Sequence, residues 1–157
     1  MSKTETVESD ASTLTFASEF KAAHPLLISE TLLLLQNYQT QREQHASSTG
    51  IPYSGLPPTT QKAVEHCQAF SQYSNREIVR EIRQSMIRRT NGEEEQRGRG
   101  MVEWEMVQVG NLGPESTEEA RALVASLGNA DVDEEEVQRI LDDLTAIRRF
   151  QSNNNAV

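Results

Sequence analysis

Apolar residues recur with a helical period along most of this chain, and the pattern predicts a mainly helical protein. The clearest example lies near the C-terminus, where the spacing is i, i+3, i+4, i+7 and i+10. Its members are Val137, Ile140, Leu141, Leu144 and Ile147. Asp133 and Glu136 precede this stripe as an N-cap signature, and Arg148 with Arg149 follows it. We therefore expect a capped amphipathic helix at this end of the chain.

Another capped helix is predicted immediately upstream. Ser116 followed by Glu119 forms a capping box, and Gly128-Asn129 is a stop signal. The expected buried stripe comprises Ala120, Leu123, Val124 and Leu127. The preceding segment, 102–106, alternates like a strand, but Val102, Met106 and Val109 also fit one helical face. Because no second convincing strand exists to pair with it, we predict a helix there.

Two further helices are predicted in the middle of the chain. The first carries a stripe of Val64, Cys67 and Phe70, and Asn75 is a natural N-cap for the second. The second has an apolar side and a charged, solvated side. The apolar side comprises Ile78, Val79, Ile82, Met86 and Ile87, and the solvated side comprises Arg76, Glu77, Arg80, Glu81 and Arg83. We expect the two helices to form an antiparallel pair.

The N-terminal part contains a helix whose apolar residues cover nearly its whole circumference. This segment, 26–45, has apolar residues at 26–28 and four leucines at 32–35. A helix of that kind is buried on all sides, either inside the protein or between its core and another subunit. Before it, Leu14-Thr15-Phe16 alternates like a strand that is too short to be stable alone. Such a strand is able to add to the sheet edge of a partner.

Composition divides the chain into five segments within an all-α fold class. Residues 1–13 are mostly polar and acidic and are predicted to be a disordered tail. Residues 14–45 form an N-terminal hook with the leucine-rich helix. Residues 46–58, with two Gly and three Pro, predict a flexible linker. Residues 59–150 form a helical body containing a glycine-rich polar loop, and residues 151–157 are predicted to be a second disordered tail.

The charge balance argues against autonomous nucleic-acid binding. The formal net charge is -9, and a chain of that sign is not drawn to phosphates by diffuse attraction. With 36% apolar and 5% aromatic residues, part of the chain is expected to stay solvated or to pack against a partner. Segment 76–99 is the one electropositive region. Solvated helix faces explain it, and the alternative is an RNA contact at Arg88, Arg89, Arg97 and Arg99.

Candidates for catalysis are few, so we predict a non-enzyme with no cofactor and no metal. The single cysteine, Cys67, excludes an internal disulfide and a cysteine-based zinc site. His66 and Cys67 are adjacent, and adjacent helical side chains do not face each other as a thiolate pair requires. No phosphate-binding Gly-rich loop follows a strand. No secretion signal and no apolar run of membrane-spanning length is present, so we expect a soluble protein with no membrane contact.

The C-terminal run resembles a known family through the order and spacing of its motifs. They are Asn111-Leu112-Gly113-Pro114, Glu118-Glu119-Ala120, Leu123, Ser126-Leu127, Asp133-Glu134-Glu135, Gln138-Arg139-Ile140-Leu141-Asp142-Asp143 and Arg149-Phe150. Upstream, Ser29-Glu30, Phe70-Ser71 and Asn75-Arg76-Glu77 continue the match. Over about residues 14–150 the chain resembles stalk subunit four of RNA polymerase II. It departs from that family at Ala125, where a proline is usual, and in a longer loop at 90–100.

The resemblance implies a non-catalytic helical subunit with an HRDC-like helical bundle at residues 59–150. It implies a heterodimer with the OB-fold stalk subunit, polymerase subunit seven, docked on the polymerase core subunits near the RNA exit channel. The implied roles are transcription initiation, handling of nascent RNA mainly through the partner, and later mRNA export and decay. The implied location is the nucleus, with shuttling to the cytoplasm.

For the partner-binding surface we expect large apolar anchors in the hook, the leucine-rich helix and one inter-helix corner. They are Leu14, Phe16, Phe20, Leu26, Leu27, Leu33, Leu34, Leu112 and Pro114. Two alternative functions remain open at this stage. One is an HRDC-like nucleic-acid-binding module, and the other is the equivalent stalk subunit of RNA polymerase III.

Overall fold

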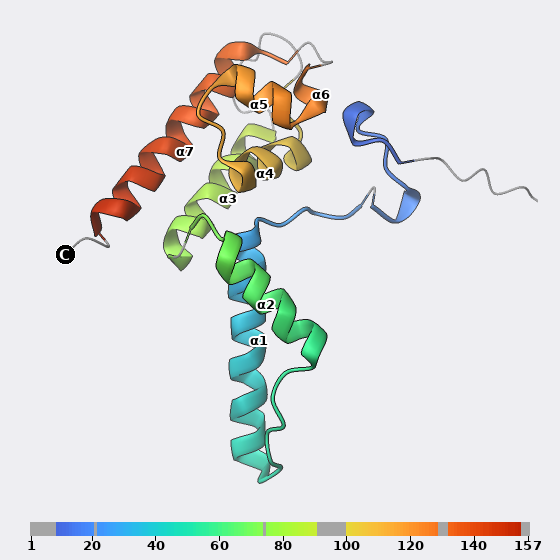
Figure 1. Cartoon of the computed structure of the whole chain (residues 1–157), viewed down its shortest axis with the longest axis vertical. Helices are drawn as coiled ribbons and strands as arrows, with labels where there is room; N and C mark the ends of the chain where they lie inside the picture. Colours follow the sequence, from blue (N-terminus) through green and yellow to red (C-terminus); the bar gives the residue numbers. More distant parts are fainter. Residues whose placement is uncertain (1–8, 21, 74, 91–99, 129–131, 155–157) are drawn as a thin grey trace, which may run out of the picture.

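The computed structural model describes residues 9–20, 22–73, 75–90, 100–128 and 132–154. These residues form an all-α fold with no strand among them, which confirms the predicted fold class. Two long helices project as an arm, and the remaining α-helices gather into a body at one end of that arm (Figure 1). The arm and the body meet where the first helix begins.

The arm is an antiparallel pair of α1 (Ile28–Thr49) and α2 (Pro58–Phe70). Helix α1 ends at Gly50, whose left-handed φ of 71° suits glycine and whose amide bonds the Ala46 carbonyl at 3.0 Å. Pro58 opens α2 at its first position, where no intrahelical N–H bond is lost. The predicted linker at 46–58 was therefore too long, because 46–49 continue α1 and only residues 50–57 connect the two helices.

The pairing of α2 corrects a second expectation. Helix α2 lies along α1 (Figure 1), whereas the sequence pattern suggested a pair with the helix that follows α2. Of the predicted stripe on α2, Cys67 is buried and Phe70 is exposed. The apolar stripe of α2 is narrow enough to pack against one helix only, and that helix is α1.

The body is built from α3 (Arg76–Thr90), α4 (Glu103–Leu112), α5 (Thr117–Leu123), α6 (Ala125–Gly128) and α7 (Glu134–Asn154). Its core contains most of the apolar residues that the sequence predicted for these helices, whereas the predicted stripe members Ile87, Val102 and Leu123 are exposed. The main buried side chains are Val79, Ile82, Met86, Met106, Val109, Ala120, Val124, Leu127, Val137, Ile140, Leu141 and Leu144. Burying each of the valine, leucine, isoleucine and methionine side chains stabilises the fold by about 1.5–3 kcal/mol, so these residues hold the body together.

The helix ends in the body largely follow the predicted capping signals. The Asn75 side chain accepts from the Glu77 amide at 2.8 Å, Ser116 from the Glu119 amide at 3.2 Å, and Asp133 from the Glu135 amide at 3.1 Å. Each satisfies an N–H that has no intrahelical partner. The stretch at 102–106, which alternates in sequence, is helical from Glu103 onward, as predicted.

The helix predicted between Ser116 and Gly128 is interrupted. Val124 has φ -115° and ψ 89°, which ends α5, and α6 begins at Ala125. The break turns Leu123 to the surface while Val124 and Leu127 stay in the core. The expected stripe was therefore wrong at Leu123, because a continuous helical period does not hold across the break.

Both predicted tails are shorter than expected where the structure describes them. Residues 151–154 continue α7 rather than forming a tail, and 155–157 lie outside the described residues. At the other end, 11–13 form a short 3-10 helix, η1 (Ala11–Thr13), while residues 1–8 lie outside the described part. A second short turn, η2 (Ser18–Phe20), follows.

The predicted strand at Leu14-Thr15-Phe16 does not form within this chain. Leu14 adopts a left-handed conformation with φ 56° that ends η1, and Thr15 makes one isolated antiparallel bridge to Asp10. A residue with positive φ cannot continue an extended ladder. The segment is thus a tight turn in the chain on its own.

Candidate partner-binding surface

An exposed apolar stripe runs along α1 on the arm. Leu34 and Tyr38 lie one helical turn apart, and their side chains are 56% and 42% exposed. Arg42 extends the stripe, because its guanidinium donates to the Tyr38 hydroxyl at 3.0 Å and lies 5.7 Å from that ring. Exposed leucines are ordinary when single, but a leucine and a tyrosine side by side on a projecting helix form a contact surface suited to a protein partner.

More exposed apolar side chains lie on the second helix of the arm and at its tip. Phe70, at the end of α2, is 58% exposed and stacks with His66 at a ring-centroid distance of 4.7 Å. Ile51, in the connection between α1 and α2, is also exposed. The arm therefore carries large apolar groups at several points along its length.

The structure sorts the nine predicted partner-binding residues into three groups. Phe20, Leu26, Leu34 and Leu112 are exposed, as an interface residue must be in the separate chain. Leu14, Phe16 and Leu33 are half-buried, and Leu33 packs against the core. Leu27 and Pro114 are fully buried within the chain itself.

The burial of Leu27 and Pro114 corrects their assignment to the interface. Leu27 lies immediately before α1 and belongs to the core cluster of the body. Pro114 follows the left-handed Gly113 (φ 64°) that ends α4. A fully buried side chain touches only its own chain and offers a partner no surface, so both residues stabilise the subunit rather than the complex.

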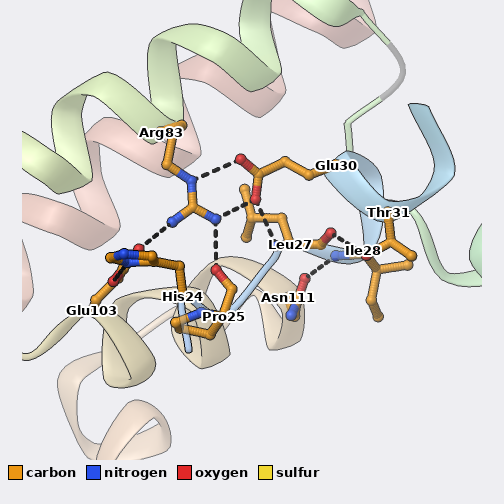
Figure 2. Close-up of polar contacts among 9 residues, drawn as sticks. All are labelled: His24, Pro25, Leu27, Ile28, Glu30, Thr31, Arg83, Glu103 and Asn111. Carbon is orange, nitrogen blue, oxygen red and sulfur yellow. Dashed lines mark hydrogen bonds and ion pairs between the residues drawn. The ribbon is translucent and has the colours of Figure 1, made fainter. Parts of the chain in front are cut away.

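The orientation of the arm depends on a polar cluster centred on Arg83 of α3 (Figure 2). The Arg83 Nε donates to Glu30 Oε1 of α1 at 2.7 Å, and its Nη2 bonds the other Glu30 oxygen. Nη1 donates to Glu103 Oε1 of α4 at 2.7 Å, and Nη2 also donates to the Pro25 carbonyl at 2.8 Å. His24 Nδ1 lies 2.9 Å from Glu103 Oε2. One guanidinium therefore joins α1, α3, α4 and the segment that enters α1.

Arg83 and Glu30 are largely shielded from water, and this strengthens their attraction. Their side chains are 16% and 14% exposed. The hydrogen bonds that Arg83 donates to Glu30 raise the pKa of the guanidinium, desolvation by burial opposes this rise, and the charges of Glu30 and Glu103 add to it. The guanidinium stays charged, and its planar fork matches two carboxylates at once.

Glu30 and Asn111 also fix the first turn of α1. Glu30 Oε2 accepts from the Leu27 amide at 2.8 Å, and Asn111 Oδ1 of α4 accepts from the Ile28 amide at 2.9 Å (Figure 2). Thr31 Oγ1 donates to the Leu27 carbonyl at 3.2 Å. The bonds to Glu30 and Asn111 satisfy N–H groups that a helix leaves unpaired at its start. The start of α1 is therefore held by its own Glu30 and by Asn111 of the body.

A hydroxyl cluster ties the end of α2 to the start of α1. The hydroxyls of Ser29 and Ser71 are 2.8 Å apart, Ser29 Oγ accepts from the Tyr73 amide at 3.0 Å, and Ser71 Oγ donates to the Tyr73 carbonyl at 3.0 Å. Burial raises the pKa of the Tyr73 hydroxyl, and the charge of Arg148 partly opposes this. Both helices of the arm are thus anchored at the same end.

Sequence reasoning placed Arg83 on a solvated helix face, and the structure shows otherwise. Helical spacing does put Arg83 beside Arg80, which is exposed. The polar partners of Arg83 are 20 to 58 residues away along the chain, so no local pattern shows them. The one signal in the sequence was the Ser29-Glu30 pair within the family resemblance. Both residues contribute to the contacts that fix the arm, but the resemblance did not indicate that role.

The four arginines predicted to contact RNA are not tested by this structure. Arg97 and Arg99 lie outside the described residues. Arg88 and Arg89 fall within α3, but their side chains lie outside the described part. Within the described ranges, no group of three or more His, Cys, Asp or Glu side chains is placed to hold a metal ion. None of the helices in those ranges is long and apolar enough to cross a membrane.

Comparison with known proteins identifies relatives over nearly the whole chain. The family model described as RNA polymerase Rpb4 matches residues 25–148. The chain is 31% identical over 147 residues to DNA-directed RNA polymerase II subunit 4 of Arabidopsis thaliana, which covers 92% of this chain and 96% of that protein. It is 30% identical to subunit rpb4 of Schizosaccharomyces pombe over 92% of this chain and 95% of that protein. For subunit rpb4 of Dictyostelium discoideum the identity is 28%, over 91% of each.

Proposed function

This chain belongs to the RNA polymerase Rpb4 family, and we propose that it forms a stalk heterodimer with the OB-fold polymerase subunit seven. It is a non-catalytic subunit of RNA polymerase II, a nuclear enzyme. The predicted class, a polymerase subunit rather than an enzyme, is therefore confirmed. The identity of its direct partner is our proposal.

The observation that carries this proposal is the exposed stripe of Leu34 and Tyr38 on α1. One side of the helix packs on α2, and Leu34 and Tyr38 are the large apolar side chains of α1 that the folded chain leaves exposed. Stable complexes bury clusters of large apolar and aromatic side chains, and tyrosine is among the residues enriched at energetic centres of interfaces. A projecting arm offers such a stripe without disturbing the body.

The proposed interface keeps the exposed members of the predicted set and adds Tyr38. Its anchors are Leu26, Leu34, Tyr38 and Leu112, with Phe20 and the segment 14–16 as the hook. Leu33 is half-buried and contributes mainly to the subunit's own packing. We retain the proposal that Leu14-Thr15-Phe16 adds a strand to a sheet of subunit seven.

The wider roles that we propose depend on this heterodimer. We propose that the heterodimer docks on the polymerase core near the RNA exit channel and acts in initiation and in handling nascent RNA, mainly through subunit seven. An HRDC-like body, auxiliary RNA contacts at Arg88, Arg89, Arg97 and Arg99, and shuttling to the cytoplasm in mRNA export and decay belong to the same proposal. The net charge of -9 supports a partner subunit over an autonomous RNA-binding module.

The test is co-purification of the full chain with subunit seven and with the polymerase. Leu34→Asp is expected to weaken the binding of subunit seven at least about tenfold, because it places an unpaired charge in an apolar contact. Leu123→Asp is the matched control, since Leu123 is 50% exposed on the body and lies outside the proposed interface. Circular dichroism checks that both variants keep their helices.

Each result separates the proposal from its alternatives. Equal binding by Leu34→Asp and the wild type argues against the α1 stripe, and undiminished binding after removal of residues 1–20 argues against the hook. Co-purification with RNA polymerase III instead of RNA polymerase II supports the equivalent stalk subunit. Tight binding of single-stranded RNA by the isolated chain, with a steep dependence on salt, supports the binding-module alternative.

A further inference from the structure

The segment Asp10–Phe16, which we call the latch, folds back as a tight turn. The Asp10 side chain accepts from the Ser12 amide at 2.8 Å and from the Ser12 hydroxyl at 2.7 Å. Asp10 and Thr15 exchange two backbone hydrogen bonds, at 2.8 and 2.9 Å. The turn lies beside α6 of the body (Figure 1). It is N-terminal to the residues that the family model matches.

Leu14 introduces backbone strain into this turn. Its φ of 56° and ψ of 28° are left-handed, and it is the one non-glycine residue with positive φ in the described part of the chain. Such a conformation is unfavourable for residues with a Cβ, and leucine lacks the short polar side chain with which Asn or Asp offsets it. The turn is therefore closed at an energetic cost that an extended Leu14 does not carry.

Phe16 is the main apolar anchor of the latch. Its ring packs on Trp104 of α4, with ring centroids 5.6 Å apart and planes tilted by 50°. Phe16 is half-buried, and Trp104 in turn packs against the core. One aromatic contact of this kind adds a modest stabilisation beyond the area that it buries. The latch is held by few contacts, so it opens more easily than the helices of the body.

We propose that the latch is a conformational switch: it is closed in the free subunit, and subunit seven opens it into an extended strand. This inference rests on the proposed function. The two states exclude each other because Leu14 is left-handed in the closed turn, with φ 56°, whereas a strand at 14–16 needs an extended Leu14. Two backbone hydrogen bonds between Asp10 and Thr15 also hold the closed turn. Opening also releases the left-handed strain at Leu14, which lowers the free energy needed to exchange one state for the other.

Trp104 reports the state of the latch directly, because it is the single tryptophan of the chain. In the free full-length protein, Phe16→Ala is expected to expose the indole, with increased quenching of its fluorescence by acrylamide. Addition of subunit seven to the wild type is expected to raise the quenching toward that of the free Phe16→Ala variant. Unchanged or reduced quenching on binding overturns the switch.

Two substitutions at Leu14 isolate the backbone strain. Leu14→Gly and Leu14→Ala both remove the side chain, but only glycine tolerates positive φ without strain. Leu14→Gly is expected to stabilise the closed latch relative to Leu14→Ala, with less Trp104 quenching in the free chain. It is expected to bind subunit seven about fivefold more weakly than Leu14→Ala. Ala11→Gly is the control, since Ala11 has an ordinary negative φ, and it is expected to show no such weakening.

The outcomes distinguish the switch from the proposed function. If subunit seven binds the wild type while Leu14→Gly and Leu14→Ala bind equally, the switch is wrong and the heterodimer stands. If subunit seven does not bind the wild type at all, the proposed function fails and the opening step fails with it. In that case the order of quenching in the free variants still decides whether the closed turn exists.

Discussion

The guanidinium of Arg83 and the carboxylate of Glu30 meet across 53 residues of sequence, and their pairing fixes the start of the arm on the body (Figure 2). Both side chains are largely buried, and Arg83 also holds Glu103 and the Pro25 carbonyl. The apolar stripe of α1 begins one helical turn after Glu30. The direction in which the subunit presents that stripe therefore depends on a polar contact rather than on the apolar residues themselves.

Arg83→Met is expected to lower the free energy of unfolding by about 3 kcal/mol. It removes a buried charge and leaves Glu30 and the Pro25 carbonyl without this donor. Arg83→Lys is expected to recover part of the loss, because an ammonium keeps the charge without the planar fork. Urea denaturation followed by circular dichroism measures both.

Arg80→Met is the control for that series. Arg80 is exposed one turn earlier on α3, so its replacement is expected to change the free energy of unfolding by less than about 0.5 kcal/mol. Equal losses in the free energy of unfolding for Arg83→Met and Arg80→Met are incompatible with a stabilising role of the polar cluster around Arg83.

Gly110→Ala is expected to destabilise the fold by about 1 kcal/mol through a clash with Leu27. A Cβ at this position would lie 2.8 Å from Leu27 Cδ2 and 3.2 Å from Met86 Cε. In a Leu27→Ala background the same change is expected to be neutral or stabilising, because only the flexible end of Met86 then lies close to the Cβ and alanine favours the helix. The double-mutant cycle measures this coupling.

Gly128→Ala serves as the matched control for the clash. The nearest atom to its added Cβ is the Arg121 carbonyl oxygen at 3.7 Å, which is an ordinary contact. Gly128→Ala is expected to show no coupling to Leu27→Ala. If the effects of Gly110→Ala and Leu27→Ala are also additive, the close approach of α4 to Leu27 is contradicted.

The buried Tyr73 is expected to make the protein less stable at alkaline pH. Burial raises its folded-state pKa above the ordinary value of 10.0. The stabilisation is present below pH 10.0 and is lost as the pH rises toward the folded-state pKa, because the unfolded chain releases the proton first. The slope approaches about 1.4 kcal/mol per pH unit for one group.

Tyr73→Phe is expected to reduce this slope between pH 10 and 11, while the exposed Tyr38→Phe leaves it in place. Urea denaturation at several pH values gives the comparison. The weak bond from the Tyr73 hydroxyl to the Gly110 carbonyl, at 3.5 Å, makes only a small difference at neutral pH. An identical slope in the wild type and in Tyr73→Phe rules out Tyr73 as the source.

Ala125→Pro is expected to stabilise the fold by about 0.5–1 kcal/mol. Ala125 is the first residue of α6, where proline loses no intrahelical bond, and Val124 before it has the non-helical backbone that a following proline favours.

Ala122→Pro provides the contrast within α5. Ala122 is exposed, but it lies inside the helix, where proline removes a backbone bond and clashes with the preceding turn. It is expected to destabilise the fold by about 3 kcal/mol. Thermal denaturation of the two variants beside the wild type tests the opposite signs.

Local signals in the sequence determined most of the helices of the body. The spacing of Val137, Ile140 and Leu144 defines one apolar face whatever surrounds it, and the Ser116 and Asp133 caps act on amides two or three residues away. Such patterns operate within a few residues, so they are visible without a structure. The order of motifs likewise identified the polymerase subunit family.

Tertiary structure alone decided which sides of these helices are covered. Leu27 and Leu34 are equally apolar, yet Leu27 lies in the core and Leu34 is exposed, because α2 and the body approach α1 from particular directions. The sequence predicts a solvated Arg83, but the fold brings Glu30, 53 residues away, into contact with it. The sequence predicts a strand at Leu14, but the chain turns there and Asp10 pairs with Thr15. Contacts of long sequence separation leave no local pattern, and in this protein they fix the arm on the body, the exposed stripe and the contact of Phe16 with Trp104.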